Sequence, residues 1–366
     1  MKLLLGYELT TGEPVEIPLK HLCACGQTQE SGKTTALEAL ITRSELRAIA
    51  FVTKRGERGF EAGRRIQPYF QERADWEFVA SILEATMHER MKFERAWIVR
   101  ATRGARTLAD VQRNVHELQS KAKRSMDQDL YMLLGEYLEK VVPAIDRLPR
   151  APRLELAPGL NVMDLRDYPE ELQALVIASS VRWVHYNADN VITIVPEAWK
   201  FAPQGRNSPV KFELRKLARE GAGLKNYIWI DSQDIAGVEK ELLRAAAVWL
   251  IGVQREHNEL ERALASIPRG IKRPTAGDVA HLGLGEFYAC WGEHVHKVYV
   301  QPAWMNTETA RQVALHEGQG KPVGPPNPGR SITAGSGSSS TARSRRATWW
   351  CSKTKTAGTA CSTTSN

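Results

Sequence analysis

The most informative segment of this 366-residue chain reads Gly26-Gln27-Thr28-Gln29-Glu30-Ser31-Gly32-Lys33-Thr34-Thr35. It follows the apolar run 19–25 and precedes residues 36–41, which have helical character. Glycines let a backbone curl so that its N–H groups point inward, and a helix N-terminus adds positive potential, which together favour an anion. The segment therefore predicts a phosphate-binding loop, in which Lys33 reaches the outer phosphates and Thr34 ligates Mg²⁺.

The spacing of this loop departs from the usual motif by one residue. Four residues normally separate the first glycine from the Gly-Lys pair, whereas five lie between Gly26 and Gly32. Either the loop carries one extra residue, or Gln27 takes the first-glycine position in a conformation that glycine tolerates better. All ten residues are candidates for nucleotide binding. A chance Gly-Lys-Thr at an ordinary helix start is the alternative.

Short apolar runs alternate with helical periodicity through most of the chain. This pattern is typical of an α/β fold with a mostly parallel sheet, and a hydrophobic content of 42% is enough for a sizeable core. Residues 191–195 read as a strand buried on both faces. The expected strands are 19–25, 48–53, 161–165, 191–195, 227–231 and 248–251, followed by a hairpin of 287–291 and 295–300.

Residues 74–148 interrupt this pattern and read as helical throughout. Thr107 and Asp110 have the spacing of a capping box, and a further helix is expected to end before Pro143. Residues 325–366 have few large aliphatic side chains and are expected to be disordered. The predicted organisation is a discontinuous core of 1–73 and 149–305, a helical insertion of 74–148, a linker of 306–324 and a tail of 325–366.

The composition narrows the class of protein only slightly. Residues 330–366 supply six of the eight net positive charges, so charge is weak evidence that the folded part binds nucleic acid. No run approaches the ~20 apolar residues that span a bilayer, and the N-terminal run is too short for a signal peptide. We therefore expect a cytoplasmic protein without a membrane partner. The five cysteines have no paired spacing that predicts disulfides or a zinc site.

Two polar residues follow expected strands and are candidates for the chemistry of hydrolysis. Glu197 follows strand 191–195, and hydrolysis needs a carboxylate that orients water, normally after a strand next to the loop's own strand. Pro196 stands where an aspartate usually helps to hold Mg²⁺ through water, so Glu197 is also the candidate for that contact. Gln233 follows strand 227–231 and is a candidate to touch the γ-phosphate. Helix capping by Glu197 and a simple turn at Gln233 are the alternatives.

Four blocks of the chain together resemble the HerA–FtsK class of ring-forming P-loop ATPases. They are the loop 26–35 and residues 195–203, 219–221 and 232–234. The resemblance covers residues 1–305 and implies a RecA-like core, commonly hexameric, that uses ATP and Mg²⁺ to move along or package DNA. It implies that Lys33 and Thr34 bind phosphate and Mg²⁺, that Glu197 is the base, and that Gln233 is the sensor.

Such rings also insert an arginine from a neighbouring subunit, and Arg255 is the candidate for that role. A solvated arginine at a helix start is the alternative. The chain is expected to begin almost directly at the loop's strand, without the N-terminal barrel of cellular HerA proteins, as in viral packaging relatives. Ala222 stands where the class often has an arginine after residues 219–221.

Basic residues in two stretches are candidates for contacts with DNA phosphates. They are Lys54, Arg55 and Arg58 after the second strand, and Arg206 and Lys211 after the Glu197 segment. A solvated basic surface is the alternative. The expected partners are further copies of the chain in a ring, DNA, and a nuclease or packaging protein. A secretion-type motor and a nucleotide-binding regulator with weak or no hydrolysis stay open as other functions.

Overall fold

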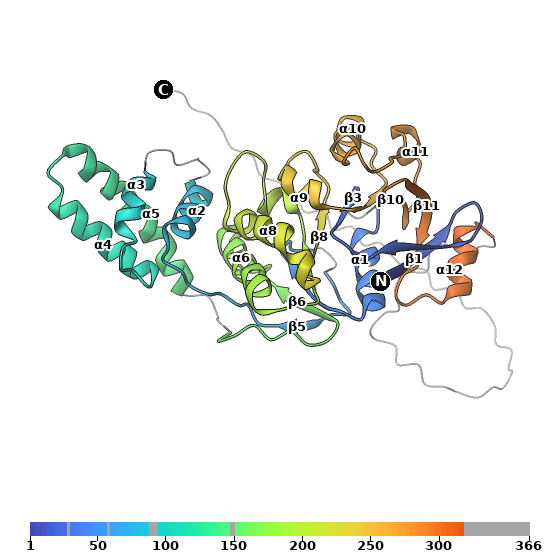
Figure 1. The fold of residues 1–366 in the computed structure, drawn as a ribbon, viewed down its shortest axis with the longest axis horizontal. Helices are drawn as coiled ribbons and strands as arrows, with labels where there is room; N and C mark the ends of the chain where they lie inside the picture. Colours follow the sequence, from blue (N-terminus) through green and yellow to red (C-terminus); the bar gives the residue numbers. More distant parts are fainter. Residues whose placement is uncertain (28–29, 57–58, 88–93, 147–150, 318–366) are drawn as a thin grey trace, which may run out of the picture. The chain divides into compact units, whose positions relative to one another are not determined.

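The computed structural model describes residues 1–27, 30–56, 59–87, 94–146 and 151–317 (Figure 1). The disorder expected for residues 325–366 lies outside the described residues, as do Thr28, Gln29 and Arg58. The strands are β1 (Lys2–Glu8), β2 (Pro14–Pro18), β3 (Leu22–Cys25), β4 (Arg47–Val52), β5 (Arg64–Ile66), β6 (Leu160–Asp164), β7 (Val191–Val195), β8 (Tyr227–Ser232), β9 (Val248–Gly252), β10 (Glu286–Trp291) and β11 (His294–Val300).

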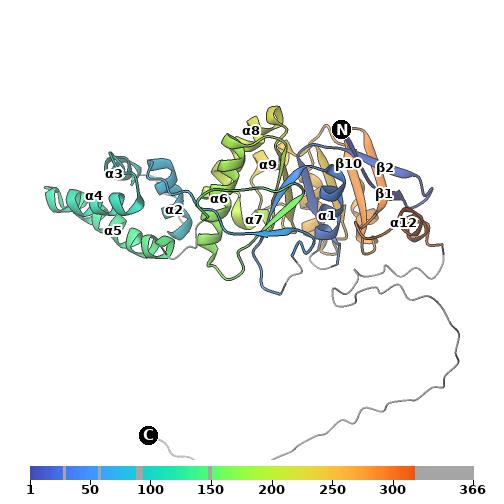
Figure 2. The ribbon, with the colours of Figure 1, turned by 90° about the horizontal axis from the view of Figure 1, so that it is seen from below.

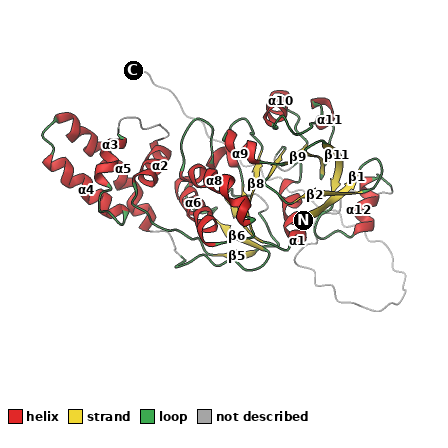
Figure 3. Ribbon diagram, viewed as in Figure 1, coloured by secondary structure: helices red, strands yellow, loops and turns green. Residues whose placement is uncertain are grey.

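Within the described residues these strands form one sheet in the order β2-β1-β11-β10-β9-β3-β8-β7-β4-β6-β5 (Figure 3). Every adjacent pair from β9–β3 to β6–β5 in this order is parallel, whereas β9 pairs antiparallel with β10. The strands β10, β11, β1 and β2 pair antiparallel. The predicted α/β fold with a mostly parallel sheet is confirmed, and every strand expected from an apolar run is present.

The first two strands correct the expectation that the chain begins almost directly at the strand of the loop. β1 pairs with both β2 and β11, and Leu3, Leu5, Val15 and Ile17 are buried. The partner strand β11 lies almost 300 residues further along the chain, so no local sequence pattern predicts this pairing. The N-terminal segment thus extends the sheet through long-range antiparallel pairs.

Helices lie on both faces of the sheet (Figure 2), and alternate residues of β4 belong to two different apolar clusters. Ala48 and Ala50 of β4 belong to the apolar cluster that includes α1 (Lys33–Ser44). Ile49 and Phe51 belong to the cluster that includes α6 (Glu170–Asn187) and α8 (Pro209–Glu220). Because successive strand residues point to opposite faces, burial on both faces explains the continuous apolar runs in the sequence.

The insertion is helical, as expected. Its helices are α2 (Trp76–Met87), α3 (Arg95–Ala101), α4 (Leu108–Lys121) and α5 (Ser125–Asp146). Thr107 and Asp110 form the predicted capping box, with both reciprocal hydrogen bonds present. The predicted end of the last helix before Pro143 is wrong, because α5 continues through this proline to Asp146. A proline removes one intrahelical N–H but does not by itself end a helix.

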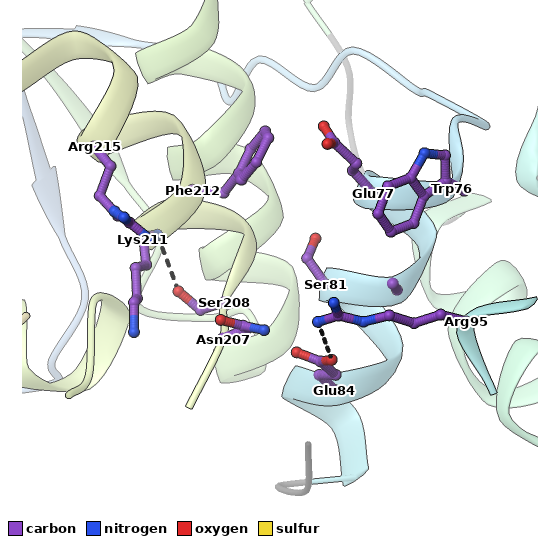
Figure 4. Close-up of a pocket in the computed structure, with 11 residues that line it drawn as sticks. Trp76, Glu77, Ser81, Glu84, Arg95, Asn207, Ser208, Lys211, Phe212 and Arg215 are labelled. Atoms are coloured by element: carbon purple, nitrogen blue, oxygen red, sulfur yellow. Dashed lines mark hydrogen bonds and ion pairs between the residues drawn. The ribbon is translucent and has the colours of Figure 1, made fainter. Parts of the chain in front are cut away.

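A cavity of about 200 Å³ lies where α2 approaches α8 (Figure 4). Its lining mixes aromatic, acidic and basic side chains, and Glu84 pairs there with Arg95 at 3.3 Å. The labelled lining residues are Trp76, Glu77, Ser81, Glu84, Arg95, Asn207, Ser208, Lys211, Phe212 and Arg215. The lining includes no residue of the loop 26–35, so this cavity is separate from the predicted nucleotide site.

The C-terminal part of the described chain differs from the linker expected for residues 306–324. Thr307–Ala314 form helix α12, whose Ala310 and Ala314 are buried in a cluster with Tyr7 and Tyr299. The small alanines give no aliphatic stripe in the sequence, which explains why this helix was not predicted. Within the described ranges, no helix is both long enough and apolar enough to cross a membrane.

Asn161 of β6 is fully buried and ties a turn to the sheet, which gives a test of the fold. Its Nδ2 donates to the carbonyl oxygens of Ala48, Ala157 and Gly159, and its Oδ1 accepts from the Ala157 N–H. Asn161→Ala should lower the free energy of unfolding by about 2 to 4 kcal/mol, because several buried groups lose their partners. Urea titration of the full chain measures this loss.

The matched control is Asn187→Ala at the exposed end of α6, where the side chain makes one bond, to Trp183 O at 3.1 Å. This change should alter the free energy of unfolding by less than about 0.5 kcal/mol. Equal losses in the two variants would contradict the role given to Asn161.

Candidate nucleotide-binding site

The loop between β3 and α1 has the backbone shape of an anion cradle. Gly32 precedes α1 with a φ of 80°, and Gly26 has a φ of 144°, both in the region that favours glycine. The N-cap residue of α1 is Gly32, which has no side chain to cap the helix, and the first turn of α1 has no acidic residue. The exposed N–H groups and the helix dipole therefore favour a bound anion at this end.

The backbone of Gln27 bears on which residue takes the first-glycine position. Gln27 is not among the described residues with positive φ, so it does not take the conformation that glycine tolerates better. Its N–H donates to Val253 O at 2.8 Å, and its carbonyl accepts from Ser31 Oγ at 2.9 Å. These contacts favour the alternative in which the loop carries one extra residue between Gly26 and Gly32.

Lys33 lies at the centre of the cradle and is buried, with 7% of its side chain exposed. Its Nζ donates to Gly26 O at 2.6 Å and lies 3.7 Å from Asp231 Oδ1. The ammonium thus sits between the start of the loop and the end of β8, close to the uncapped helix end. A buried cation needs such partners, and a phosphate would be a further one.

Asp231 is the site residue that the sequence analysis did not assign. It belongs to β8, where it is in register with Ala24 of β3. The sequence does show a carboxylate near the end of a buried strand. It does not show the strand order, and only the pairing of β3 with β8 reveals that this carboxylate faces Lys33.

The expected position of the Glu197 strand is only partly correct. β8 pairs with β3 on one side and with β7 on the other, so β7 is the second strand from β3 and not its neighbour. The carboxyl ends still meet at one edge, since Cys25 is in register with Ser232 and Val195 with Ile230. Glu197 and the loop therefore share an edge of the sheet, with β8 between their strands.

Glu197 is buried and strongly held. Its Oε1 accepts from Lys54 Nζ at 2.6 Å and its Oε2 accepts from Trp199 Nε1 at 2.5 Å. Its backbone has a φ of 46° and a ψ of 52° at the start of the short helix α7 (Ala198–Phe201). A left-handed conformation is costly for a residue with a side chain and is often found at functional sites.

Gln233 and Arg255 are both exposed near the same edge. Gln233 directly follows β8. Arg255 follows β9 and pairs with Glu30 of its own loop, Nη1 to Oε2, at 3.0 Å. Arg255 therefore lies beside the loop of its own chain. Its side chain is 69% exposed to solvent.

The candidate DNA contacts occupy different environments. Arg55 is 77% exposed and pairs with Asp167 at 3.2 Å, and Arg206 is half-buried. Lys211 is 8% exposed, and its ammonium contacts Glu239 Oε2 at 2.6 Å and the carbonyl oxygens of Pro203 and Arg206. Lys211 therefore holds the loop before α8 in place rather than presenting its charge to a ligand.

The residues at the loop fit a nucleotide with Mg²⁺. Thr34 is the second residue of α1 and half-buried, next to Lys33. A hydroxyl at this position and the nearby carboxylate of Asp231 are the hard oxygen donors that Mg²⁺ prefers. In the described part of the chain, no group of three or more His, Cys, Asp and Glu could hold a metal alone.

Solved structures match the chain closely in fold although not in sequence. VirB4 of Thermoanaerobacter pseudethanolicus superposes with a TM-score of 0.64 at 14% identity, covering 82% of this chain and 97% of VirB4. The chain has the fold of VirB4. The bacterial conjugative coupling protein TrwB, lacking 70 N-terminal residues and unbound, gives a TM-score of 0.54 at 12% identity, covering 84% of this chain and 96% of TrwB.

A second TrwB structure, in complex with the non-hydrolysable ATP analogue ADPNP, has a TM-score of 0.55 at 12% identity and covers 84% of this chain and 97% of TrwB. No family model and no curated protein matches the sequence. These likenesses confirm the α/β fold that the four blocks imply.

The cysteine that precedes the loop gives a test of how firmly this edge is packed. Burial raises the pKa of Cys25 to about 12, although Lys33 opposes the shift. Burial, followed by the charge of Cys25, raises the pKa of Cys290 to about 12. Because the thiolate is the reactive form, about one thiol in ten thousand should be ionised at pH 8. The ionised fraction of each thiol should rise about tenfold per pH unit up to a pH of about 12.

We expect maleimide at pH 8 to leave Cys25 and Cys290 unmodified in the native chain and to modify both in urea. Peptide mass spectrometry separates them from Cys351 and Cys361, which lie outside the described residues. Rapid labelling of Cys25 in the native chain would show that β3 and the loop open readily.

Proposed function

We propose that this chain is an ATP-binding and ATP-hydrolysing motor of the HerA-like type that moves or packages double-stranded DNA as a ring. The observation that carries the proposal is the buried Lys33 ammonium, held between Gly26 O and Asp231 beside the uncapped N-terminus of α1. That arrangement suits the outer phosphates of a nucleotide. TrwB, which shares the fold, has been solved with an ATP analogue, and this supports ATP as the ligand.

In this proposal each polar group at the edge has a separate task. Lys33 and the loop N–H groups bind the phosphates, and Thr34 ligates Mg²⁺, with Glu197 as a candidate ligand through water. When bound, Mg²⁺ neutralises charge on the transferred phosphoryl group. Glu197 is the base that orients the attacking water, and Gln233 is the sensor that follows β8.

Two further parts of the proposal, the movement of DNA and the assembly into a ring, are supported by the shared fold and by exposed basic residues. TrwB is described as a conjugative coupling protein, which supports a role with DNA. Lys54, Arg55 and Arg206 are the candidates for phosphate contacts that the structure leaves accessible at least in part. Arg255, which pairs with Glu30 in its own chain, is the candidate arginine for a neighbouring subunit's site after that pair breaks.

A nucleotide-binding regulator with weak hydrolysis is the second candidate function. The observation that favours it is the position of Glu197, whose two carboxylate oxygens are both bonded to side chains of the same chain. Pro196 also stands where an aspartate usually helps to hold Mg²⁺. Both candidate functions use the loop to bind a nucleotide, and they differ in the rate at which ATP is hydrolysed.

Turnover of ATP by the full chain, with and without double-stranded DNA, tests the proposal. We expect DNA to raise the rate. Lys33→Ala should abolish nucleotide binding, and Glu197→Gln should keep it while lowering turnover about 100-fold or more, because the base is lost. Lys121→Ala, on the exposed surface of α4, is the control and should match the wild type.

Fluorescent-nucleotide binding and phosphate release provide the two measurements. Binding without turnover, in the presence and absence of DNA, would favour the regulator. Binding that survives Lys33→Ala would contradict the assignment of the loop itself.

A further inference from the structure

We propose that the turn between α3 and α4 of the helical insertion (Figure 1) is a further surface for DNA, on which three arginines contact backbone phosphates. The arginines are Arg100, Arg103 and Arg106, and all three are exposed. Residues 95–107 contain four arginines and neither Asp nor Glu. The inference rests on the DNA-moving part of the proposed function and adds a contact that belongs to the insertion.

Hydrogen bonds from α4 give this turn one defined backbone shape. Asn114 Nδ2 donates to Ala101 O at 2.8 Å and to Arg103 O at 3.3 Å. Asp110, which forms the capping box at the start of α4, also accepts from the Arg106 N–H, Oδ2 to N at 3.1 Å. The backbone that carries the three arginines is thus ordered in advance, and a ligand that binds them loses less conformational entropy.

The charges of the three arginines are available to a ligand. In the described part of the chain none of their guanidinium groups forms an ion pair, whereas Arg95 at the start of α3 pairs with Glu84 at 3.3 Å. Arg100 lies over the ring of Trp97, with its Cζ 6.0 Å from the ring centroid. Gly104 has a φ of 72°, and a Cβ placed there would meet no atom within 4 Å. The turn is therefore open to solvent.

The chemistry of the turn favours phosphate groups over a protein or a membrane. A guanidinium is a planar fork that matches two phosphate oxygens. Ala105 is the only hydrophobic residue within 102–107, whereas protein interfaces have an apolar or aromatic centre and membrane-binding segments insert apolar side chains. Exposed arginines without such groups fit a nucleic acid backbone, which proteins contact without reading the base sequence.

Removal of the three charges together tests this surface. The full chain with Arg100→Gln, Arg103→Gln and Arg106→Gln should bind a fluorescent duplex of about 30 base pairs at least about tenfold more weakly than the wild type at about 50 mM salt. The slope of log Kd against log salt concentration should fall by about 2 to 3, because each phosphate contact contributes about 0.9. Fluorescence anisotropy without nucleotide measures both quantities.

The matched control removes three exposed charges outside the insertion. Lys240, Arg244 and Arg269 are exposed and, within the described ranges, form no ion pair. Changing all three to Gln lowers the net charge by the same amount and should alter the affinity for the duplex less than about threefold, because charges beyond a Debye length are screened. Equal losses in the two variants would assign the binding to overall charge and overturn the inference.

Competition experiments distinguish DNA from other anionic partners. The competitors are unlabelled duplex, poly-glutamate, and vesicles of phosphatidylserine and phosphatidylcholine in equal parts, all compared at the same anionic charge. The unlabelled duplex should displace the fluorescent duplex from the wild type far more effectively than the other two, because the arginines match phosphates spaced along a backbone. Equal displacement by poly-glutamate or by the vesicles would contradict a nucleic acid surface.

The same variant separates this inference from the proposed function. Its ATP turnover without DNA should equal that of the wild type, because the three arginines belong neither to the loop between β3 and α1 nor to the segments after β7 and β8. A chain that binds the duplex through these arginines but hydrolyses no ATP would overturn the motor and leave the surface standing. A chain that hydrolyses ATP, and whose arginine variant binds the duplex as the wild type does, would overturn the surface alone.

Discussion

The burial of the Lys33 ammonium is the constraint on which the rest of the site depends. A charge with 7% exposure is tolerated only beside acceptors, and here they come from the start of the loop and from β8. To bring Gly26 and Asp231 to the same ammonium, β3 and β8 must be parallel neighbours. The loop, the helix start and the strand order therefore form one unit that packing on both faces of the sheet keeps in place.

The sequence predicted the parts of this unit that are local. The continuous apolar runs of β4, β7 and β9 identify strands buried on both faces, and the loop residues identify the cradle, because these signals lie within a few consecutive residues. The capping box at Thr107 is local in the same way. The fold class follows from these signals without knowledge of any long-range pair.

The features that the sequence did not predict all depend on partners that are distant in the chain. β1 needs β11, and the contact of Asp231 with Lys33 needs the pairing of β3 with β8. Glu197 was identified as a candidate base from its place after β7, but its bonded state depends on Lys54. Helix α12 was missed for another reason, since its buried face is made of alanines.

The basic residues show why counting charges said little about DNA. Lys33 and Lys211 are buried, and each ammonium pairs with a carboxylate and donates hydrogen bonds to carbonyl oxygens inside the fold. Lys54 is divided between the interior, where it holds Glu197, and the solvent. Arg55 alone among the four is largely exposed. Basic residues therefore serve different purposes here, in the cradle, as a loop anchor and on the surface. Only the three-dimensional structure shows which purpose each residue serves.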